Sequence, residues 1–441
     1  MNTQAVSLTR GRAGRYTATA LAAVAVLALG AFAPAAAQVA APKTLYVWPG
    51  GSDSGTCTSA SPCETVSYAL SKAASGATIE VSGTIDDHPE ISHPVTITTW
   101  PGGPAGSPAV LDGTANGTVV TVSSDATGVI LHDLTIENGS PGISNDGTLT
   151  LTDSTVSGNA DAFEPYAGIY DYDGTVTVMD STVTKNSGSG GDGAGIYSGG
   201  GTMTVIASTI SGNTGGGIYS AGTITLGATI VADNTGGPNC LASGTGSRLV
   251  SAGYNLTNDK TGTACSFTTA TDLVNKQPAL GHLASNGGPT QTLLPATTSP
   301  AADMIPNPKT LHGHPVCPGT DQRGVTRPGL GETGCTIGAV EAGFTNPTTT
   351  AVTLTPATVT AGTKVAYLAV VNPKSGTGTP TGTITFTTGT TTLCTAVLSG
   401  GVAACGATNA PVGTDTVTGT YSGGDGYATS AGTAILTVTT A

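Results

Sequence analysis

A short motif recurs through the middle of the chain at nearly constant spacing. The runs Thr148-Leu-Thr-Leu151, Thr175-Val-Thr-Val178, Thr202-Met-Thr-Val205 and Thr223-Ile-Thr-Leu226 start 27, 27 and 21 positions apart. Each alternates polar and apolar residues, which is typical of a β-strand. Two further strand-like triplets recur with the same period, so every unit holds three short strands. A unit this small cannot bury its own apolar face, so the units must stack into a solenoid.

Coils with three strands, many glycines and no helical pattern predict an all-β fold. We expect a right-handed parallel β-helix over residues 44–343, in which equivalent residues lie about 4.8 Å apart. One inward column should consist of Leu149, Val176, Met203 and Ile224, with outward threonines at Thr150, Thr177, Thr204 and Thr225. Asparagine follows the third strand of four coils, where a corner needs a residue that tolerates left-handed backbone geometry. This spacing predicts a ladder of Asn159, Asn186, Asn213 and Asn234.

The two ends of the chain differ from the coils. Residues 1–37 combine three arginines with an alanine-rich apolar run and a small-residue cleavage site, which predicts a secretory signal peptide. We therefore expect a secreted or extracellular protein, with association to the cell surface as a further expectation and no membrane span in the mature chain. From residue 348 to residue 441, alternating strands separated by Gly/Pro turns predict an immunoglobulin-like sandwich.

The charge of the chain limits the classes of partner, and its cysteines indicate disulfides. Removal of three arginines and no acids takes the formal charge from −13 to −16, which argues against nucleic acid. Eight cysteines in an exported chain indicate disulfides, and because each local pair lies within one module, we predict the pairs Cys57–Cys63, Cys240–Cys265, Cys317–Cys335 and Cys394–Cys405. Cys394 and Cys405 should face each other on the two strands of one hairpin, within the geometry that a disulfide requires. A short helix over 67–74 should cap the open end of the stack.

Several strings resemble known families. Leu45-Tyr-Val-Trp-Pro-Gly-Gly-Ser-Asp53, with Cys57 and Cys63, resembles the opening of exported bacterial β-helix proteins of the pectate-lyase-like superfamily. Residues 250–343 resemble the choice-of-anchor Q module of surface proteins through Asn286-Gly-Gly-Pro-Thr-Gln-Thr292, Thr320-Asp-Gln-Arg-Gly324 and Cys335-Thr-Ile-Gly-Ala-Val-Glu341. The string Tyr421-Ser-Gly-Gly-Asp-Gly-Tyr427 resembles bacterial Ig-like repeat domains. These resemblances imply a surface protein and carry no activity by themselves.

One face of the coils breaks the repeat. From the corner asparagine to the next Gly-Ile, the chain takes nine positions in two consecutive coils and four in the coils before and after. Insertions on one face of a repeat protein are common binding sites. The candidate binding residues there are Asp161, Glu164, Tyr166, Tyr170, Asp171, Asp173, Asp192, Tyr197 and Tyr219. Converging carboxylates would favour calcium, with Asp171 and Asp173 as candidate ligands, and no other cofactor is indicated. Solvated turn carboxylates without a function stay an open alternative.

These patterns favour one function and leave two alternatives. We expect an exported, non-catalytic surface or matrix protein, monomeric, whose β-helix binds a glycan or a surface protein, with the Ig-like domain as spacer or second contact. An outward column of tyrosines suits sugar rings. The enzyme alternative is a calcium-dependent polysaccharide lyase or epimerase, although the motifs of polygalacturonase-like enzymes are absent. A third alternative is ice binding through the outward pairs from Thr148 and Thr150 to Thr223 and Thr225.

Overall fold

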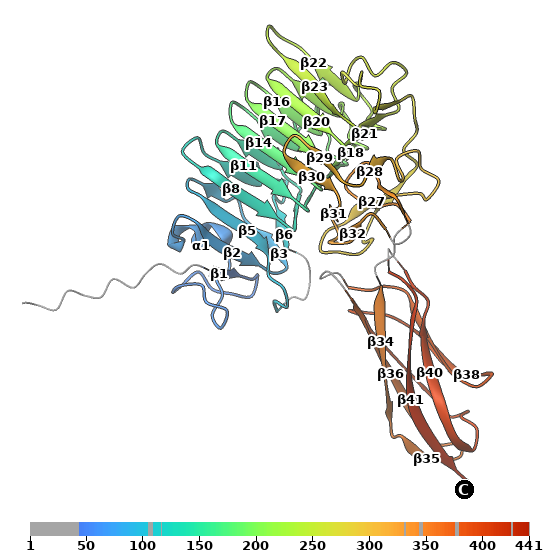
Figure 1. The fold of residues 1–441 in the computed structure, drawn as a ribbon. Helices are drawn as coiled ribbons and strands as arrows, with labels where there is room; N and C mark the ends of the chain where they lie inside the picture. The colour runs from blue at the N-terminus through green and yellow to red at the C-terminus, as the bar shows by residue number, and fades with distance from the viewer. Residues whose placement is uncertain are drawn as a thin grey trace, which may run out of the picture. The chain divides into compact units, whose positions relative to one another are not determined.

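Three long sheets run side by side through the first part of the molecule (Figure 1). The computed structural model describes residues 44–104, 109–115, 117–329, 332–343, 347–374, 379–424 and 427–440, and the predicted signal peptide lies outside them. Within each long sheet, every strand pairs in parallel with its neighbours, and successive coils contribute one strand to each sheet. The predicted fold class is confirmed as a parallel β-helix followed by a separate β-sandwich.

The strands of the three sheets are as follows. Sheet 1 contains β1 (Thr44–Val47), β2 (Ala77–Val81), β5 (Val95–Thr99), β8 (Thr127–His132), β11 (Thr148–Thr152), β14 (Thr175–Met179), β17 (Thr202–Ile206), β20 (Thr223–Gly227) and β23 (Arg248–Gly253). Sheet 2 contains β4 (Glu90–Ile91), β7 (Val120–Val122), β10 (Ile143–Asn145), β13 (Ile169–Asp171), β16 (Ile196–Ser198), β19 (Ile218–Ser220) and β22 (Cys240–Ala242). Sheet 3 contains β3 (Thr84–Asp86), β6 (Ala109–Asp112), β9 (Leu134–Glu137), β12 (Thr155–Ser157), β15 (Thr182–Thr184), β18 (Thr209–Ser211), β21 (Ile230–Ala232), β24 (Leu256–Thr257) and β25 (Leu273–Val274).

The register of sheet 1 confirms the predicted inward column. Leu149 pairs with Val176, which pairs with Met203, which pairs with Ile224, and all four side chains are buried. Most of the threonines between them are partly exposed, as alternation requires. Thr225 is the exception, because only 8% of it is exposed. The expectation that all four threonines lie outside is therefore wrong at this coil, and the outward threonine array is interrupted there.

The predicted asparagine ladder runs along the corner between sheets 3 and 2. The side-chain amide of Asn159 donates to Asn186 Oδ1 at 3.0 Å, and Asn186 donates to Asn213 Oδ1 at 2.9 Å. Asn213 donates to Asn234 Oδ1 at 2.9 Å. The backbone expectation was wrong by one position, since the left-handed residue is the one before each asparagine, as at Lys185 with φ 57°. The asparagines hold the corner through side-chain hydrogen bonds rather than through unusual backbone angles.

After the last coil, residues 280–341 fold back along the outside of sheet 3, and we call them the fold-back segment. It holds the short pairs β26 (Leu280–Ala284) with β27 (Thr292–Pro295), β28 (Ile305–Pro306) with β33 (Gly334–Cys335), β29 (Lys309–Leu311) with β30 (His314–Cys317), and β31 (Gly319–Thr320) with β32 (Thr326–Arg327). Thr155 on β12 donates to the carbonyl of Gln291 at 2.6 Å, and Thr182 on β15 donates to Gln322 Oε1 at 2.6 Å. All three residues of β12, β15 and β18 are consequently buried on both faces.

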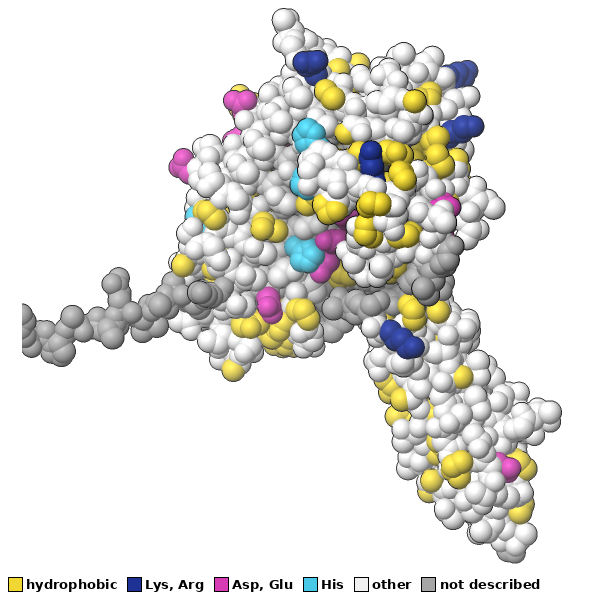
Figure 2. Space-filling model, in the orientation of Figure 1, with side chains coloured by type: hydrophobic (Ala, Val, Ile, Leu, Met, Phe, Trp, Pro, Cys, Tyr) yellow, Lys and Arg dark blue, Asp and Glu magenta, His cyan; other side chains and the backbone are white. Residues whose placement is uncertain are grey.

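The surface in view in Figure 2 carries only scattered charged side chains, whereas several charged groups of the fold-back segment are removed from solvent and anchor it. Arg323 is fully buried and donates to Asp321 Oδ2 at 3.0 Å through Nε and 2.7 Å through Nη2. Arg327 donates to the carbonyl of Gly338 at 2.7 Å, and its Nε lies 4.0 Å from Glu341 Oε2. Asp321, Arg323 and Glu341 belong to the strings that resemble the choice-of-anchor module, and in this structure they stabilise the fold-back segment.

The remaining expected elements also form. The helix α1 (Val66–Lys72) begins after Thr65, whose hydroxyl accepts from the Tyr68 amide at 3.1 Å, close to the predicted range. All four predicted disulfides are present. Among the described residues, no helix has the length and apolar character needed to cross a membrane.

The C-terminal part forms a sandwich of two sheets. One contains β34 (Thr348–Thr355), β36 (Val365–Pro373) and β39 (Val402–Ala407). The other contains β35 (Thr358–Thr360), β41 (Ser430–Thr439), β40 (Gly413–Tyr421), β37 (Thr383–Thr388) and β38 (Thr391–Val397). The pair Cys394–Cys405 was predicted because these residues would face each other in one hairpin. The pairing is confirmed and that reason is wrong, since the disulfide connects strands of the two different sheets.

Candidate functional site

The predicted tyrosine column forms on the outer face of sheet 2. Tyr170 on β13 pairs with Tyr197 on β16, which pairs with Tyr219 on β19. The isoleucine before each tyrosine is buried in the core, so alternation directs the three phenol rings outward. Tyr166, from the first lengthened corner, joins them. The structure therefore brings together the four tyrosines that the sequence pointed to.

The rings of this column stack on one another in pairs. Tyr166 and Tyr170 have ring centroids 4.0 Å apart with an angle of 7° between the planes. Tyr197 and Tyr219 are 4.4 Å apart at 17°, and the two pairs meet edge to face between Tyr170 and Tyr197 at 5.7 Å. The expectation of a row of free flat faces needs correction, because the paired faces largely cover each other. What the column offers to solvent is mainly ring edges and hydroxyl groups.

Two exposed aromatic residues were not selected from the sequence, one beside the column and one in the lengthened corner that also carries Tyr166. Tyr172 is 61% exposed and lies 6.1 Å from Tyr170, edge to face. Phe163, in the first lengthened corner, is 91% exposed. A phenylalanine inside a repeat-breaking insertion is itself a signal, since burial is the usual fate of this side chain. Together with Tyr166, Tyr170, Tyr197 and Tyr219, they form a surface that we call the aromatic face.

Burial, with a smaller contribution from nearby carboxylates, raises the pKa of Tyr166, Tyr170 and Tyr197. Burial raises the pKa of Tyr166, and the charges of Glu164 and Asp161 raise it further. Burial and the neighbouring tyrosines, with a smaller contribution from Asp146, raise the pKa of Tyr170 to about 12. The hydroxyls of Tyr166, Tyr170 and Tyr197 are therefore neutral at physiological pH and can both donate and accept hydrogen bonds.

Asp161 stabilises the first lengthened corner through hydrogen bonds. Its carboxylate accepts from the Ser140 hydroxyl at 2.6 Å and from the backbone amides of Phe163 and Glu164 at 2.8 and 2.9 Å. Although burial acts in the opposite direction, these hydrogen bonds hold the pKa of Asp161 below its usual range. The carboxylate thus fixes the loop that presents Phe163.

The predicted acidic corner does not converge. Asp171 is buried in the wall of the coil, where it accepts from Asn145 Nδ2 at 2.9 Å and from the Gly174 amide at 3.2 Å, while Asp173 is exposed. In the described part of the chain, no three or more His, Cys, Asp or Glu side chains gather in a way that could hold a metal ion. Burial raises the pKa of Asp171 to about 6. The expectation that these carboxylates meet is wrong, and calcium binding stays a prediction without this geometric support.

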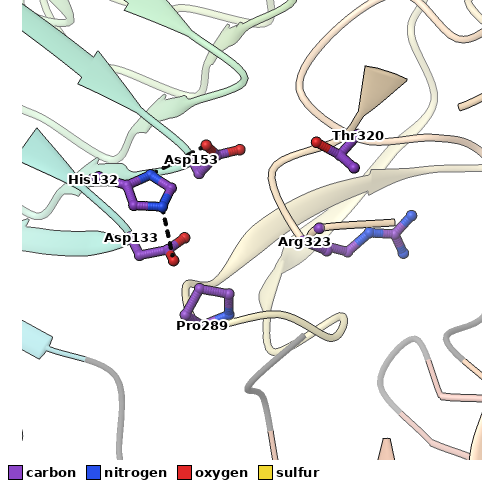
Figure 3. Close-up of a pocket in the computed structure, with 7 residues that line it drawn as sticks. His132, Asp133, Asp153, Pro289, Thr320 and Arg323 are labelled. Atoms are coloured by element: carbon purple, nitrogen blue, oxygen red, sulfur yellow. Dashed lines mark ion pairs between the residues drawn. The ribbon is translucent and has the colours of Figure 1, made fainter. Parts of the chain in front are cut away.

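A second cluster lies at the corner between sheets 1 and 3, where no functional residue was predicted. His132 Nε2 is 3.2 Å from Asp133 Oδ2, and its Nδ1 is 3.3 Å from Asp153 Oδ2 in the next coil (Figure 3). The contact with Asp153 raises the pKa of His132, and burial raises that of Asp133 to about 6. With a carboxylate near each ring nitrogen, the charged form of this imidazole is favoured.

This cluster lines a cavity of about 200 Å³ under the fold-back segment, whose walls are His132, Asp133, Asp153, Pro289, Thr320, Arg323 and Gly324. The guanidinium of Arg323 points away from the histidine toward its own buried partners (Figure 3). The sequence held one hint of the cluster, because His132 is the only histidine between residues 94 and 281. Its partners across the cavity lie more than 150 residues away and could not be predicted from local pattern.

Comparison with known proteins identifies one part of the chain. Residues 352–441 match the family model of the bacterial Ig-like domain (group 3). Comparison with curated proteins and with solved structures gave no significant match. The C-terminal sandwich is therefore a bacterial Ig-like domain, and this domain together with a parallel β-helix fits a surface protein.

Proposed function

We propose that this is an exported surface protein that binds a polysaccharide along the aromatic face of its β-helix. The observation that carries the proposal is the repetition of tyrosine along sheet 2, in register, from Tyr170 to Tyr197 to Tyr219. A surface that repeats along an axis suits a ligand that repeats along its own length. The ring edges and hydroxyls of the column, together with the exposed rings of Tyr172 and of Phe163 in the adjoining corner, suit a partner rich in hydroxyl groups.

The other functions considered lack such support. A lyase or epimerase site at the acidic corner needs carboxylates that meet, and Asp171 is instead turned into the wall of the coil. Ice binding needs a regular outward threonine array, which is interrupted at Thr225. The resemblance to choice-of-anchor modules adds to the case for a surface location and does not bear on the ligand.

A glycan array probed with the exported chain tests the proposal. We expect binding to one class of polysaccharide, and at least tenfold weaker binding for the double variant Phe163→Ala, Tyr172→Ala. Tyr68→Ala is the matched control, because Tyr68 lies on α1, away from sheet 2. Melting curves of all three chains check that the fold persists. An array without any bound glycan, or a double variant that binds as the parent does, would contradict the proposal.

A further inference from the structure

The charges around the aromatic face restrict the kind of polysaccharide. The carboxylates nearby are those of Asp146, Asp161, Glu164, Asp173 and Asp192. Burial is the main cause of the raised pKa values of Tyr166 and Tyr197, and the charges of Glu164 and Asp161 at Tyr166 and of Asp192 at Tyr197 add to it. Lys185 is the single lysine or arginine between residues 133 and 247. Along these coils the surface is therefore strongly anionic.

The negative field has opposite effects on anionic and on cationic polysaccharides. A uronate polymer would place carboxylates against carboxylates, and such like-charge contacts oppose binding. An amino sugar with a free amine carries an ammonium group at neutral pH. That group is attracted by the carboxylates and by the electron-rich face of an exposed tyrosine ring, which Tyr172 offers beside Asp173.

The position of the carboxylates also favours a long ligand. Glu164 and Asp192 lie in the two successive lengthened corners, which are in contact because the Ser189 amide donates to the Glu164 carbonyl at 2.8 Å. Negative groups are therefore present in both coils beside the tyrosine column. A chain with an amine on each sugar unit can contact both positions at once.

We propose that the ligand of the aromatic face is an amino-sugar polymer with free amino groups, a polycationic glycan. This inference rests on the proposed function and adds the charge of the polysaccharide to it. The tyrosines supply ring edges and hydroxyls to the sugars, and the carboxylates of Glu164, Asp173 and Asp192 supply the preference for ammonium.

The test compares two oligosaccharides that differ only in the amine. Calorimetric titration of the whole mature chain would use a β-linked glucosamine oligomer and its fully N-acetylated counterpart of equal length. We expect the free amine to bind at least tenfold more tightly at low ionic strength, and the ratio to shrink as salt is added, because exposed charges are screened. The triple variant Glu164→Gln, Asp173→Asn, Asp192→Asn should bind both oligomers equally.

Two controls separate the causes. Glu64→Gln, Asp86→Asn, Asp415→Asn removes the same charge at positions outside sheet 2 and its corners and should keep the preference. A lysine peptide with the same number of ammonium groups as the oligomer should bind at least tenfold more weakly than the oligomer. If the peptide binds as tightly as the oligomer, the surface recognises positive charge alone and the inference is wrong.

The outcomes distinguish this inference from the proposed function. Equal binding of both oligomers by the parent chain, lost in Phe163→Ala, Tyr172→Ala, overturns the amine preference and keeps the polysaccharide site. Binding of neither oligomer also overturns the amine preference, and the glycan array then decides whether another polysaccharide binds. Tighter binding of the acetylated oligomer would show that the carboxylates repel rather than attract the ligand.

Discussion

Two outer faces of the same β-helix differ in solvent exposure, because one is covered by the chain itself and the other stays open. On sheet 3, the outward residues Thr155, Thr182 and Thr209 are buried beneath the fold-back segment. On sheet 2, the outward residues Tyr170, Tyr197 and Tyr219 stay partly exposed. Small hydroxyl side chains let another part of the chain approach closely and hydrogen-bond to them, whereas large rings satisfy each other by stacking. The comparison teaches that the outward residue of a repeat determines whether the face is covered by its own chain or stays open.

The covered face should be the more fragile one, and the largest effect is expected there. Arg323→Ala leaves Asp321 buried without its partner, which should lower the free energy of unfolding by about 3–5 kcal/mol. Chemical denaturation measures the change. Arg248→Ala, at an exposed arginine, is the control and should change the stability by at most about 0.5 kcal/mol. Equal effects of the two variants would mean that the fold-back segment does not depend on its buried pair.

The asparagine ladder joins the two faces, and its loss should cost less. Asn186→Ala removes a donor to Asn213 and an acceptor for Asn159, leaving buried polar groups unpaired. We expect a loss of about 1–3 kcal/mol in the free energy of unfolding. Asn409→Ala serves as the control, because Asn409 is exposed and makes a single hydrogen bond, to Thr392. A ladder variant as stable as the parent would show that the corner is held by the backbone alone.

Acid should stabilise both faces. Burial raises the pKa of Asp171, beside sheet 2, to about 6, and it also raises the pKa of Glu341 in the fold-back segment. A raised carboxyl pKa means that the folded state binds the proton more tightly, so stability is gained as pH falls through that pKa and lost as pH rises. The raised pKa of His132 acts in the same direction.

Between pH 8 and pH 5.5 we therefore expect the free energy of unfolding to rise by about 1–2 kcal/mol. Denaturation at a series of pH values measures this slope. Asp171→Asn should reduce the slope, with the contributions of Glu341 and His132 left in place, since the amide cannot take up the proton and Asn145 already occupies the equivalent position one coil earlier. A free energy of unfolding that falls steadily from pH 8 to pH 5.5 would contradict the directions of all three pKa shifts.

The open face should tolerate change best. Tyr197→Leu removes the stack with Tyr219 and should cost only about 0.5–1.5 kcal/mol. Ile196→Ala, one residue earlier and buried, is the contrasting variant and should cost about 2–5 kcal/mol. If the tyrosine variant proves as damaging as the isoleucine variant, the column is a structural support and its availability to a ligand is in question.

The repeats made much of the fold predictable from sequence. Spacing alone gave the register of Leu149 with Val176 and the ladder of Asn159 with Asn186, because stacked coils place equivalent residues in contact. The same rule of alternation could have placed Asp171 correctly, since Ile169 points inward, Tyr170 outward and the next residue inward again. The prediction of Asp171 as a calcium ligand did not take this alternation into account.

Other features depend on contacts that no local pattern encodes. Gln322 donates to the Ser154 carbonyl across 168 positions of sequence, and His132 meets the fold-back segment only after the whole β-helix has formed. The pairing of the tyrosine rings was also hidden, because the sequence indicates which way a side chain points and does not indicate the angle between two rings. The open aromatic face was thus predictable as a location and not as a geometry.

The strand pairing of the Ig-like domain has a consequence for a protein under tension. β35, near the start of the domain, pairs in parallel with β41 at its end, and the Ala361 amide donates to the Thr439 carbonyl at 2.9 Å. Pulling on the two ends slides parallel strands past each other, so several hydrogen bonds carry the load together instead of opening one by one. The Cys394–Cys405 disulfide prevents the residues between the two cysteines from extending when the domain is pulled. We expect the domain to act as a tether that resists force rather than as a spring.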